Sequence, residues 1–368
     1  MNILVTGADG FLGKNLCLRL VEAGFNKIIK ITRATSEEQL IDGLVQADFV
    51  FHLAGINRPE NDSEFETGNS EFTKKIVNVL ATTDKKPPVM LSSSTQAVCE
   101  NTYGHSKALA EKWITDYGKI SKARYYIYRL PNVFGKWCKP GYNSFVATFC
   151  HNLANDKEIS IHNPDAEVTM IYIDDFCSEM ITLVRDERES GFRQISPIYA
   201  VTVGYVANML NSFKKSRDTL ITEEVGQGFV RALYSTWLSY LNPESFSYKV
   251  PAYSDERGVF CEMLKTPSAG QFSFFSAHPG ITRGGHYHHT KNEKFLVIKG
   301  QARFKFEHVI TGEKYELVTS SDSFEIVETA PGWSHDITNI GDDELLVMLW
   351  ANEIFDREVP DTIARALS

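Results

Sequence analysis

The sequence predicts two domains, an α/β doubly wound parallel sheet followed by an all-β barrel. The length of 368 residues exceeds that of one typical hydrophobic core. Short apolar segments alternate with helical patterns as far as Leu241, whereas strand-like segments and turns dominate after Asn242-Pro243. We therefore expect one domain over residues 1–243 and a second over residues 244–368.

The first part of the chain has the alternation that is typical of a parallel sheet covered by helices on both faces. In its first helical pattern Leu12, Leu16 and Leu20 recur every four residues and so share one face. An irregular region follows Gly135, and we interpret it as a substrate-binding lobe. The expected strands are 2–6, 28–32, 49–53, 89–92 and 125–129, and the expected helices are 11–23, 37–44, 72–82, 145–153, 203–213 and 225–241.

The last part of the chain has many short strands separated by turns, which is typical of a barrel or sandwich. Its turn signals are Pro279-Gly280, Thr311-Gly312, Pro331-Gly332 and Gly341-Asp342. The expected strands are 271–276, 294–298, 302–307, 315–318, 324–327 and 345–350.

Composition excludes several classes of protein. A net charge of −9 argues against nucleic-acid binding, which requires a basic surface. The six cysteines form no Cys-x-x-Cys pair, so neither a thiolate metal site nor a disulfide framework is indicated. No signal peptide precedes the first strand and no apolar run approaches transmembrane length. We expect a cytoplasmic protein without membrane insertion.

A glycine-rich turn links the first expected strand to the first expected helix. Gly7, Gly10 and Gly13 have the spacing Gly-x-x-Gly-x-x-Gly in this strand–turn–helix context. A turn without Cβ atoms lets a pyrophosphate approach the backbone N–H groups at the helix N-terminus. The pattern therefore predicts a dinucleotide site, and the alternative is a plain strand-to-helix turn.

A second pattern is Tyr103-x-x-x-Lys107, with Ser94 at the end of the strand before it. Tyr103 and Lys107 lie four residues apart on an expected helix, with Thr102 as its N-cap, so their side chains share one face. We expect the ammonium to lower the pKa of the tyrosine, which would then exchange a proton with a carbonyl oxygen that Ser94 also binds. Ser93 or Thr95 could instead take the place of Ser94.

These patterns resemble the extended short-chain dehydrogenase/reductase family and its nucleotide-sugar branch, which has a Rossmann fold. The similar blocks are TGADGFLG (6–13), HLAG (52–55), LSSS (91–94), YGHSK (103–107), RLPNVFG (129–135) and YIDD (172–175). The resemblance implies hydride transfer at a sugar carbon, with Ser94, Tyr103 and Lys107 as catalytic residues. It implies substrate contacts from Asn132, Val133 and Asn143, and cofactor contacts from Gly7, Gly10, Phe11, Leu12, Gly13, Leu53, Ala54, Tyr103, Lys107 and Asn132.

The second strand ends in Ile31-Thr32-Arg33 rather than in an acidic residue. A carboxylate at this place would bind a ribose 2′-hydroxyl, whereas an arginine accommodates a 2′-phosphate. We therefore expect NADP(H) as the cofactor, with Arg33 in contact with it. The alternative is that Arg33 is a solvated loop charge.

The C-terminal part contains a set of metal-ligand side chains. His286 and His288 alternate on an expected strand and share a face, Glu293 follows a short turn, and His335 lies on a later strand. Three imidazoles and one carboxylate can hold a divalent metal, zinc for Lewis-acid chemistry or iron in an oxygenase. Taken alone, a histidine pair is more often structural.

The spacing from Gly280 to Gly300, Gly-x5-His-x-His-x4-Glu-x6-Gly, resembles the first block of the cupin family. The second block is matched in part, by Gly332-x-x-His335-x3-Asn339. The resemblance implies a cupin barrel in which His286, His288, Glu293 and His335 bind the metal, with His289 pointing outward. Tyr287, Lys294 and Asp336 remain open as acid/base groups.

The order of the two domains, with the blocks at 131–144 and 286–300, resembles one bifunctional family of capsular polysaccharide assembling enzymes. The resemblance implies a UDP-4-keto-6-deoxy-amino-sugar substrate, epimerised at C-3 by the zinc-binding cupin and reduced at C-4 with NADPH. The product would be UDP-2-acetamido-2,6-dideoxy-β-L-talose, on the route to UDP-N-acetyl-L-fucosamine. Alternatives are a single-activity reductase or epimerase whose cupin only dimerises, and a sensor or scaffold. We expect a homodimer.

Overall fold

The computed structural model describes residues 1–323 and 325–367, which form two compact units. The N-terminal unit comprises Met1–Leu210 and Ala232–Leu241, and the C-terminal unit comprises Asn211–Arg231 and the residues from Asn242 onward. The sequence-based division after residue 243 stays a prediction.

The N-terminal unit is built around a six-stranded parallel sheet with the order β2-β1-β3-β4-β5-β8. Ile3 is in register with Ile28 on one side and with Phe49 on the other. Side chains of the central strands are buried, as expected for a parallel sheet with two covered faces. The strands are β1 (Ile3–Thr6), β2 (Ile28–Ile31), β3 (Phe49–His52), β4 (Val89–Ser94), β5 (Tyr125–Leu130) and β8 (Gly191–Arg193).

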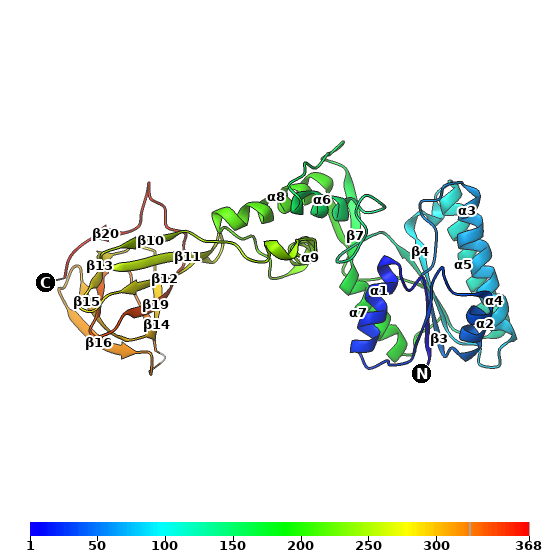
Figure 1. Ribbon diagram of the computed structural model, residues 1–368, viewed down its shortest axis with the longest axis horizontal. Helices are drawn as coiled ribbons and strands as arrows, with labels where there is room; N and C mark the ends of the chain where they lie inside the picture. The colour runs from blue at the N-terminus through cyan, green and yellow to red at the C-terminus, as the bar shows by residue number, and fades with distance from the viewer. Residues whose placement is uncertain (324, 368) are drawn as a thin grey trace. The chain divides into compact units, whose positions relative to one another are not determined.

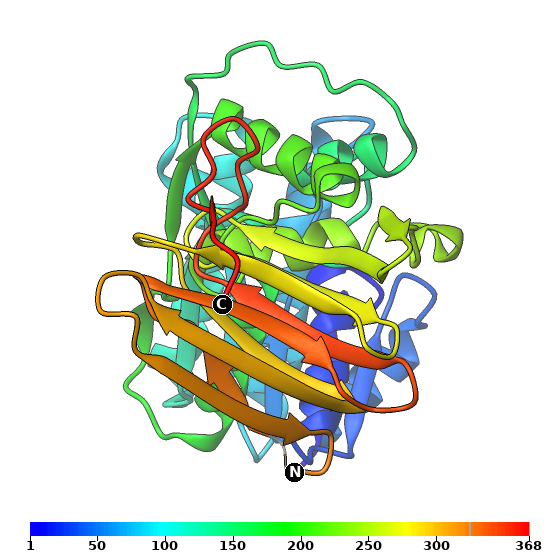
Figure 2. The same cartoon turned by 90° about the vertical axis from the view of Figure 1, so that its left-hand side faces the viewer.

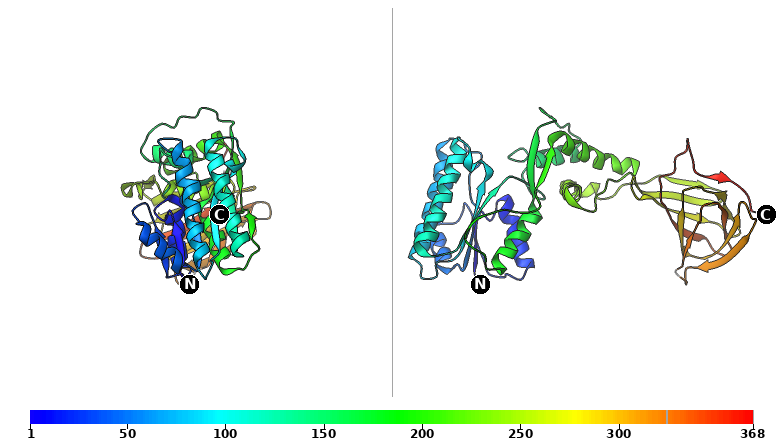
Figure 3. Two further views of the ribbon diagram at one scale, coloured as in Figure 1. Left: turned by 90° about the vertical axis from the view of Figure 1, so that its right-hand side faces the viewer. Right: turned by 180° about the vertical axis from the view of Figure 1, so that it is seen from behind.

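Helices cover both faces of this sheet (Figures 1 and 3). Alternate residues of each strand supply the two cores: Ile3 and Phe49 pack with α1 (Phe11–Glu22) and α7 (Ile173–Arg185), whereas Leu4 and Val50 pack on the opposite face. That opposite face is covered by α2 (Glu37–Gln46), α4 (Phe72–Thr82) and α5 (Thr102–Ser121). The doubly wound parallel sheet expected from the sequence is confirmed.

Local capping chemistry determines where two of these helices begin. Ser36 and Gln39 form a reciprocal capping box at the start of α2. In α5 the N-cap is Asn101, whose Oδ1 accepts a 2.7 Å hydrogen bond from the N–H of Gly104. The expectation that Thr102 is the cap is therefore wrong by one residue, because Thr102 is already helical.

The remaining elements before the C-terminal strands are short or lie outside the main sheet. A three-stranded sheet has the order β6-β7-β9, in which β6 and β7 are parallel and β9 is antiparallel to β7. These elements are α3 (Ser63–Phe65), the π-helix η1 (Glu66–Glu71), the 3₁₀ helices η2 (Thr95–Val98) and η3 (Pro243–Ser245), β6 (Asn132–Phe134), α6 (Phe145–Ala154), β7 (Glu167–Tyr172), β9 (Tyr199–Thr202), α8 (Val203–Thr219) and α9 (Gly228–Leu238).

The C-terminal unit contains two antiparallel sheets, whose strands run in yellow to red in Figure 2. The six-stranded sheet has the order β10 (Ala252–Asp255), β11 (Gly258–Thr266), β12 (Gly270–Ala277), β19 (Leu345–Ala351), β14 (Glu293–Lys299) and β17 (Ile326–Glu328). The five-stranded sheet has the order β16 (Lys314–Ser320), β15 (Gln301–His308), β18 (Trp333–Asn339), β13 (Thr282–Tyr287) and β20 (Ile363–Ala364).

The core of this unit is filled from both sheets. Phe275, Phe295 and Val347 of the six-stranded sheet pack with Phe304 and Ile337 of the five-stranded sheet. Each of the expected C-terminal strands has a counterpart in the structure, although the segment expected from 324 begins at a residue outside the described ranges and β17 starts at Ile326. The all-β character expected for this part is confirmed.

Candidate functional site

The glycine-rich turn between β1 and α1 is crowded at two of its three glycines. Gly7 has a φ of +67°, and a Cβ there would lie 2.9 Å from backbone atoms of Ala54. A Cβ on Gly13 would lie 2.1 Å from the carbonyl oxygen of Gly7, so the first turn of α1 can approach the loop only because position 13 has no side chain. Gly10 is the N-cap residue of α1. The turn thus has the geometry that the sequence pattern predicts.

A cavity of about 740 Å³ lies over this turn. Five of the eleven residues expected to contact the cofactor line it, namely Gly7, Gly10, Arg33, Leu53 and Ala54; cofactor contact by these residues stays a prediction. Phe11 and Leu12 instead pack against the core. The other lining residues, which the sequence reasoning did not single out for this role, are Asp9, Ile31, Thr32, Ala34, Thr35, Gly55, Ile56, Thr67, Gly68 and Phe72.

The loop Leu53–Gly55 below the cavity is fixed by a buried polar relay. Thr6 Oγ1 accepts a 3.1 Å hydrogen bond from the N–H of Ala54 and lies 2.8 Å from Nδ1 of His52. Nε2 of His52 lies 2.9 Å from Thr73 Oγ1. Burial and, to a smaller extent, nearby Lys107 together lower the pKa of His52 to about 3, so this imidazole is neutral at physiological pH. We assign His52 a structural role that its position at a strand end did not reveal.

Tyr103, Lys107 and Ser94 lie together at the N-terminal end of α5 and the C-terminal end of β4. The ammonium of Lys107 is 5.9 Å from the centre of the Tyr103 ring, and the Ser94 side chain is near enough to the Tyr103 hydroxyl to lower its pKa. Burial raises the pKa of Tyr103, and Ser94 opposes this only in part. The expected lowering of this pKa is therefore not found, because desolvation of the half-buried phenol is the largest effect, and Ser94 rather than Lys107 is the group that opposes it.

Lys107 is held by β4 and lies near a buried carboxylate. Its Nζ donates to the carbonyl oxygen of Ser92 at 3.2 Å, and burial lowers its pKa to about 8 although Glu111 raises it. Glu111 accepts hydrogen bonds from Ser93 Oγ at 2.6 Å and from Arg129 at 2.7 and 2.9 Å. Because Ser93 is bonded to Glu111, and Thr95 is exposed, Ser94 is the hydroxyl placed beside Tyr103.

The two expected substrate asparagines are both exposed. Asn132 is exposed on β6 and donates to the carbonyl oxygen of Thr169 at 3.4 Å. Asn143 is exposed in the loop before α6. Among the described residues, neither forms a hydrogen bond with Tyr103 or Lys107.

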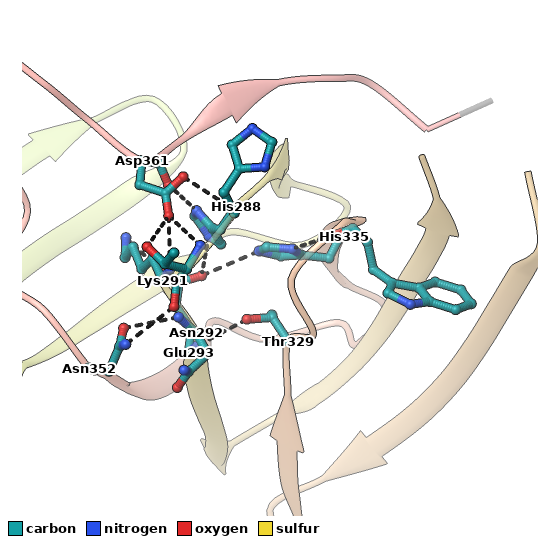
Figure 4. A network of polar contacts seen from close by, with 11 residues as sticks. His288, Lys291, Asn292, Glu293, Thr329, His335, Asn352 and Asp361 are labelled. Atoms are coloured by element: carbon teal, nitrogen blue, oxygen red, sulfur yellow. Dashed lines mark hydrogen bonds and ion pairs between the residues drawn. The ribbon is translucent and has the colours of Figure 1, made fainter. Parts of the chain in front are cut away.

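The C-terminal unit brings His286, His288, Glu293 and His335 into one cluster (Figure 4). One ligand atom from each lies within 4.8 Å of the others. His286 is on β13 and faces His335 on β18 across the register, while His288 follows directly after β13 and Glu293 begins β14. Oε2 of Glu293 lies 3.3 Å from Nε2 of His288 and 3.3 Å from Nε2 of His335.

The charges in this cluster favour an ionised Glu293. Burial acts to raise its pKa, but the imidazoles of His288 and His335 and the ammonium of Lys291 outweigh burial and lower it. Nζ of Lys291 lies 3.0 Å from Oε1 of Glu293. Burial and the neighbouring His335 lower the pKa of His286 to about 4, so the ring is neutral at physiological pH and one of its nitrogens has a lone pair for a metal.

The donor set fits a divalent cation. Nδ1 of His288 lies 2.5 Å from the carbonyl oxygen of Asp361, and Nδ1 of His335 lies 3.4 Å from that of Trp333. A carbonyl oxygen only accepts, so each ring carries a proton on Nδ1. The Nε2 atoms of both rings face the Glu293 carboxylate, an arrangement in which one cation can bind the two imidazoles and the carboxylate together.

The three open acid/base candidates do not join this cluster. Lys294 forms an exposed ion pair with Glu328 at 2.5 Å. Tyr287 contacts the ring of His289, with centroids 5.6 Å apart, and Asp336 follows His335 on β18 and so projects to the opposite face of the strand. The ammonium of Lys291 forms an ion pair with Glu293. The sequence analysis did not identify Lys291 as a site residue, because it lies in a loop, where no hydrophobic periodicity marks the direction of a side chain.

The described residues include no helix that is long and apolar enough to cross a membrane.

Residues 3–195 match the NAD dependent epimerase/dehydratase family, and residues 253–363 match the polysaccharide biosynthesis C-terminal domain. A UDP-2-acetamido-2,6-beta-L-arabino-hexul-4-ose reductase of Pseudomonas aeruginosa is 52% identical over 365 residues, which are 99% of this chain and 98% of that protein.

Two solved structures resemble this chain, one of them over its whole length. The capsular polysaccharide assembling protein CapF from Staphylococcus aureus matches with a TM-score of 0.91 and 42% identity over 100% of both chains. The Bordetella bronchiseptica enzyme WbmF, solved in complex with NAD⁺ and UDP, matches 65% of this chain and 91% of its own at a TM-score of 0.56 and 19% identity. At this identity the likeness to WbmF supports the fold alone.

Proposed function

Because the chain belongs to the NAD dependent epimerase/dehydratase family, we propose that it is a bifunctional nucleotide-sugar enzyme of the CapF type. The C-terminal unit, as a cupin barrel, epimerises C-3 of a UDP-2-acetamido-2,6-dideoxy-4-hexulose. The N-terminal unit reduces the C-4 ketone with NADPH, giving UDP-2-acetamido-2,6-dideoxy-β-L-talose on the route to UDP-N-acetyl-L-fucosamine. The name of the Pseudomonas relative, a UDP-amino-hexulose reductase, supports this substrate class.

One observation carries the proposal: a single chain holds two separate reactive clusters of complementary chemistry. The first is Ser94, Tyr103 and Lys107 in the unit with the nucleotide cavity. The second is the three-histidine, one-glutamate cluster of the other unit. A 4-keto group acidifies the adjacent C-3 proton, so enolisation and reduction are two consecutive steps on the same ketone.

In the N-terminal unit the glycine-rich turn would hold the pyrophosphate of NADP(H), and Arg33 would contact the 2′-phosphate. The cofactor, when bound, supplies the hydride. Tyr103 keeps its proton because burial raises its pKa, and its hydroxyl would give that proton to the C-4 oxygen. Ser94 would hold the same oxygen by a hydrogen bond.

In the C-terminal unit His286, His288, Glu293 and His335 would hold a divalent metal, for which zinc is sufficient because no redox change is needed. The metal, when bound, supplies a Lewis acid for the ketone oxygen. Glu293 stays ionised at neutral pH and His288 presents its Nε2 to the cluster. We further propose a homodimer, since the unit has edge strands at both ends of each sheet.

The test is a reaction in D₂O with a UDP-4-keto-6-deoxy-N-acetylhexosamine, with and without NADPH, followed by mass spectrometry and NMR. We expect deuterium at C-3 without NADPH and a C-4 alcohol only with NADPH. Reduction without deuterium at C-3 would indicate a single-activity reductase whose C-terminal unit is structural or dimerising.

A further inference from the structure

The loop that joins β13 to β14 connects two of the clustered side chains. His288 opens this loop and Glu293 ends it. Asn352, the first residue after β19, is hydrogen-bonded to this loop (Figure 4). Asn352 accepts a 3.0 Å hydrogen bond from the N–H of Asn292 and donates one of 3.4 Å to the carbonyl oxygen of Thr290.

The side chain of Asp361 closes the same loop from a second direction. Its carboxylate accepts hydrogen bonds from the N–H groups of His289 at 2.9 Å, Thr290 at 2.7 Å and Lys291 at 2.8 Å. The hydroxyl of Thr290 adds a fourth bond of 3.0 Å. Burial acts to raise the pKa of Asp361, but these donors outweigh burial and lower it, so the carboxylate is ionised at neutral pH.

The backbone of Asp361 contacts the cluster directly. Its carbonyl oxygen lies 2.5 Å from Nδ1 of His288, which fixes the Nδ1–H form of the ring and leaves Nε2 to face Glu293. One residue thus holds both the loop and the ring orientation.

Asp361 is itself held in place on its C-terminal side. Strand β20 pairs with β13, Ile363 opposite Tyr287 and Ala364 opposite His286. The N–H of Arg365 donates to the carbonyl oxygen of Gly285 at 2.8 Å, and Ser334 Oγ donates to the carbonyl oxygen of Arg365 at 2.6 Å. The segment cannot shift without disturbing the strand that carries His286.

We infer that Asp361 is a positioning residue of the metal cluster: its carboxylate fixes the loop between His288 and Glu293, and its carbonyl oxygen orients the His288 ring. The inference rests on the proposed metal-binding role of the four clustered residues. It predicts that Asp361 sets metal affinity without being a ligand. Loss of such an outer partner typically weakens metal binding about 10- to 100-fold.

The experiment compares zinc dissociation constants of the full-length wild-type protein, Asp361→Ala, Asp361→Asn and Asp356→Ala, measured by competition with a chromophoric chelator. Asp356 is the matched control, because it is exposed in the same segment and its carboxylate accepts only from the local N–H groups of Glu358 and Val359. We expect about a 10- to 100-fold weaker zinc affinity in Asp361→Ala, a smaller loss in Asp361→Asn, and wild-type affinity in Asp356→Ala.

Three further measurements separate orientation from folding. In the zinc-free protein, ¹⁵N NMR should show the Nδ1–H form of His288 in the wild type and a mixture of forms in Asp361→Ala. NADPH affinity and circular dichroism should be unchanged, and if Asp361→Ala does not fold then Asp361→Asn carries the comparison. Zinc affinity at the wild-type value in the folded Asp361 variants overturns the inference. A wild-type protein that takes up no zinc would instead reject the metal site itself, and the role of Asp361 with it.

Discussion

Oγ of Ser93 donates a 2.6 Å hydrogen bond to Oε1 of Glu111, and this bond separates the roles of two adjacent serines. Ser94 instead accepts a 3.1 Å hydrogen bond from the N–H of Gln96 and lowers the pKa of the nearby Tyr103 hydroxyl. We predict that Ser94→Ala lowers kcat for NADPH oxidation about 10- to 100-fold, the value of one hydrogen bond to a developing charge. Ser93→Ala should mainly lower the free energy of unfolding, by about 1–3 kcal/mol, because it removes a donor from a buried carboxylate. Steady-state kinetics and thermal unfolding of both variants check this, and a larger kcat loss in Ser93→Ala would reverse the assignment.

Tyr103→Phe removes the proposed proton donor and leaves the ring in place. We expect NADPH oxidation to fall by about 10²- to 10⁴-fold, the usual contribution of general acid catalysis. Deuterium exchange at C-3 should continue at the wild-type rate, because that step belongs to the other unit. Mass spectrometry of the substrate after incubation in D₂O measures the exchange. Loss of both activities in this variant would contradict the division of labour.

Lys107 should set a descending limb in the pH profile of the reductase. Burial lowers its pKa to about 8 in the protein without cofactor, so the ammonium is charged below pH 8 and neutral above it. We expect kcat/KM for NADPH, which reports the free enzyme, to fall as the pH rises through about 8. In Lys107→Arg the guanidinium stays charged, so any remaining activity should lack this limb. An unchanged limb in that variant would assign it to another group.

Arg33 should determine which nicotinamide cofactor is preferred. It lines the nucleotide cavity, where a carboxylate would repel a 2′-phosphate and accept from a 2′-hydroxyl. We expect Arg33→Glu to shift the NADPH-to-NADH ratio of kcat/KM about 10- to 100-fold toward NADH, the range for one charged hydrogen bond. Arg33→Gln, which only removes the charge, should give a smaller shift. A preference that neither variant changes would show that Arg33 is a solvated loop charge.

His288→Ala should remove the metal and the epimerisation together. The substitution deletes one of four clustered donors, the one whose Nε2 lies 3.3 Å from Oε2 of Glu293. We expect zinc content, measured by atomic emission after gel filtration, to fall well below that of the wild type, and C-3 exchange to be lost. Treatment of the wild type with a strong chelator should reproduce the loss, and added zinc should reverse it. Exchange at the full rate in His288→Ala would refute the ligand assignment.

The fold could be predicted from the sequence largely because its signals are local. The four-residue spacing of Leu12, Leu16 and Leu20 and the Gly7–Gly13 pattern depend on neighbours in the chain. The N-cap was placed one residue too late because Asn101 and Thr102 are both acceptable caps in sequence, and only the 2.7 Å bond to Gly104 distinguishes them.

Site residues that are close together in the sequence could be predicted from their spacing, whereas contacts between distant residues and the effects of burial could not. His286, His288 and Glu293 are close in sequence, so their grouping follows from strand geometry. Asp361 is 70 residues beyond Lys291 and reaches the loop only through tertiary pairing of β20 with β13. The pKa of Tyr103 was predicted in the wrong direction because desolvation depends on burial, which the pattern Tyr-x-x-x-Lys does not report.

The position of Asp361 late in the chain has a consequence for the order in which the protein is made. All residues that line the nucleotide cavity lie between Gly7 and Phe72, whereas the cluster of the C-terminal unit needs Asp361 and the strand after it. Domains generally fold from the N-terminus during synthesis. The residues that line the nucleotide cavity are therefore synthesised early. Asp361, which fixes the His288–Glu293 loop, is added nearly 290 residues after Phe72. Premature termination in the last strand would leave the first site intact and the second one open.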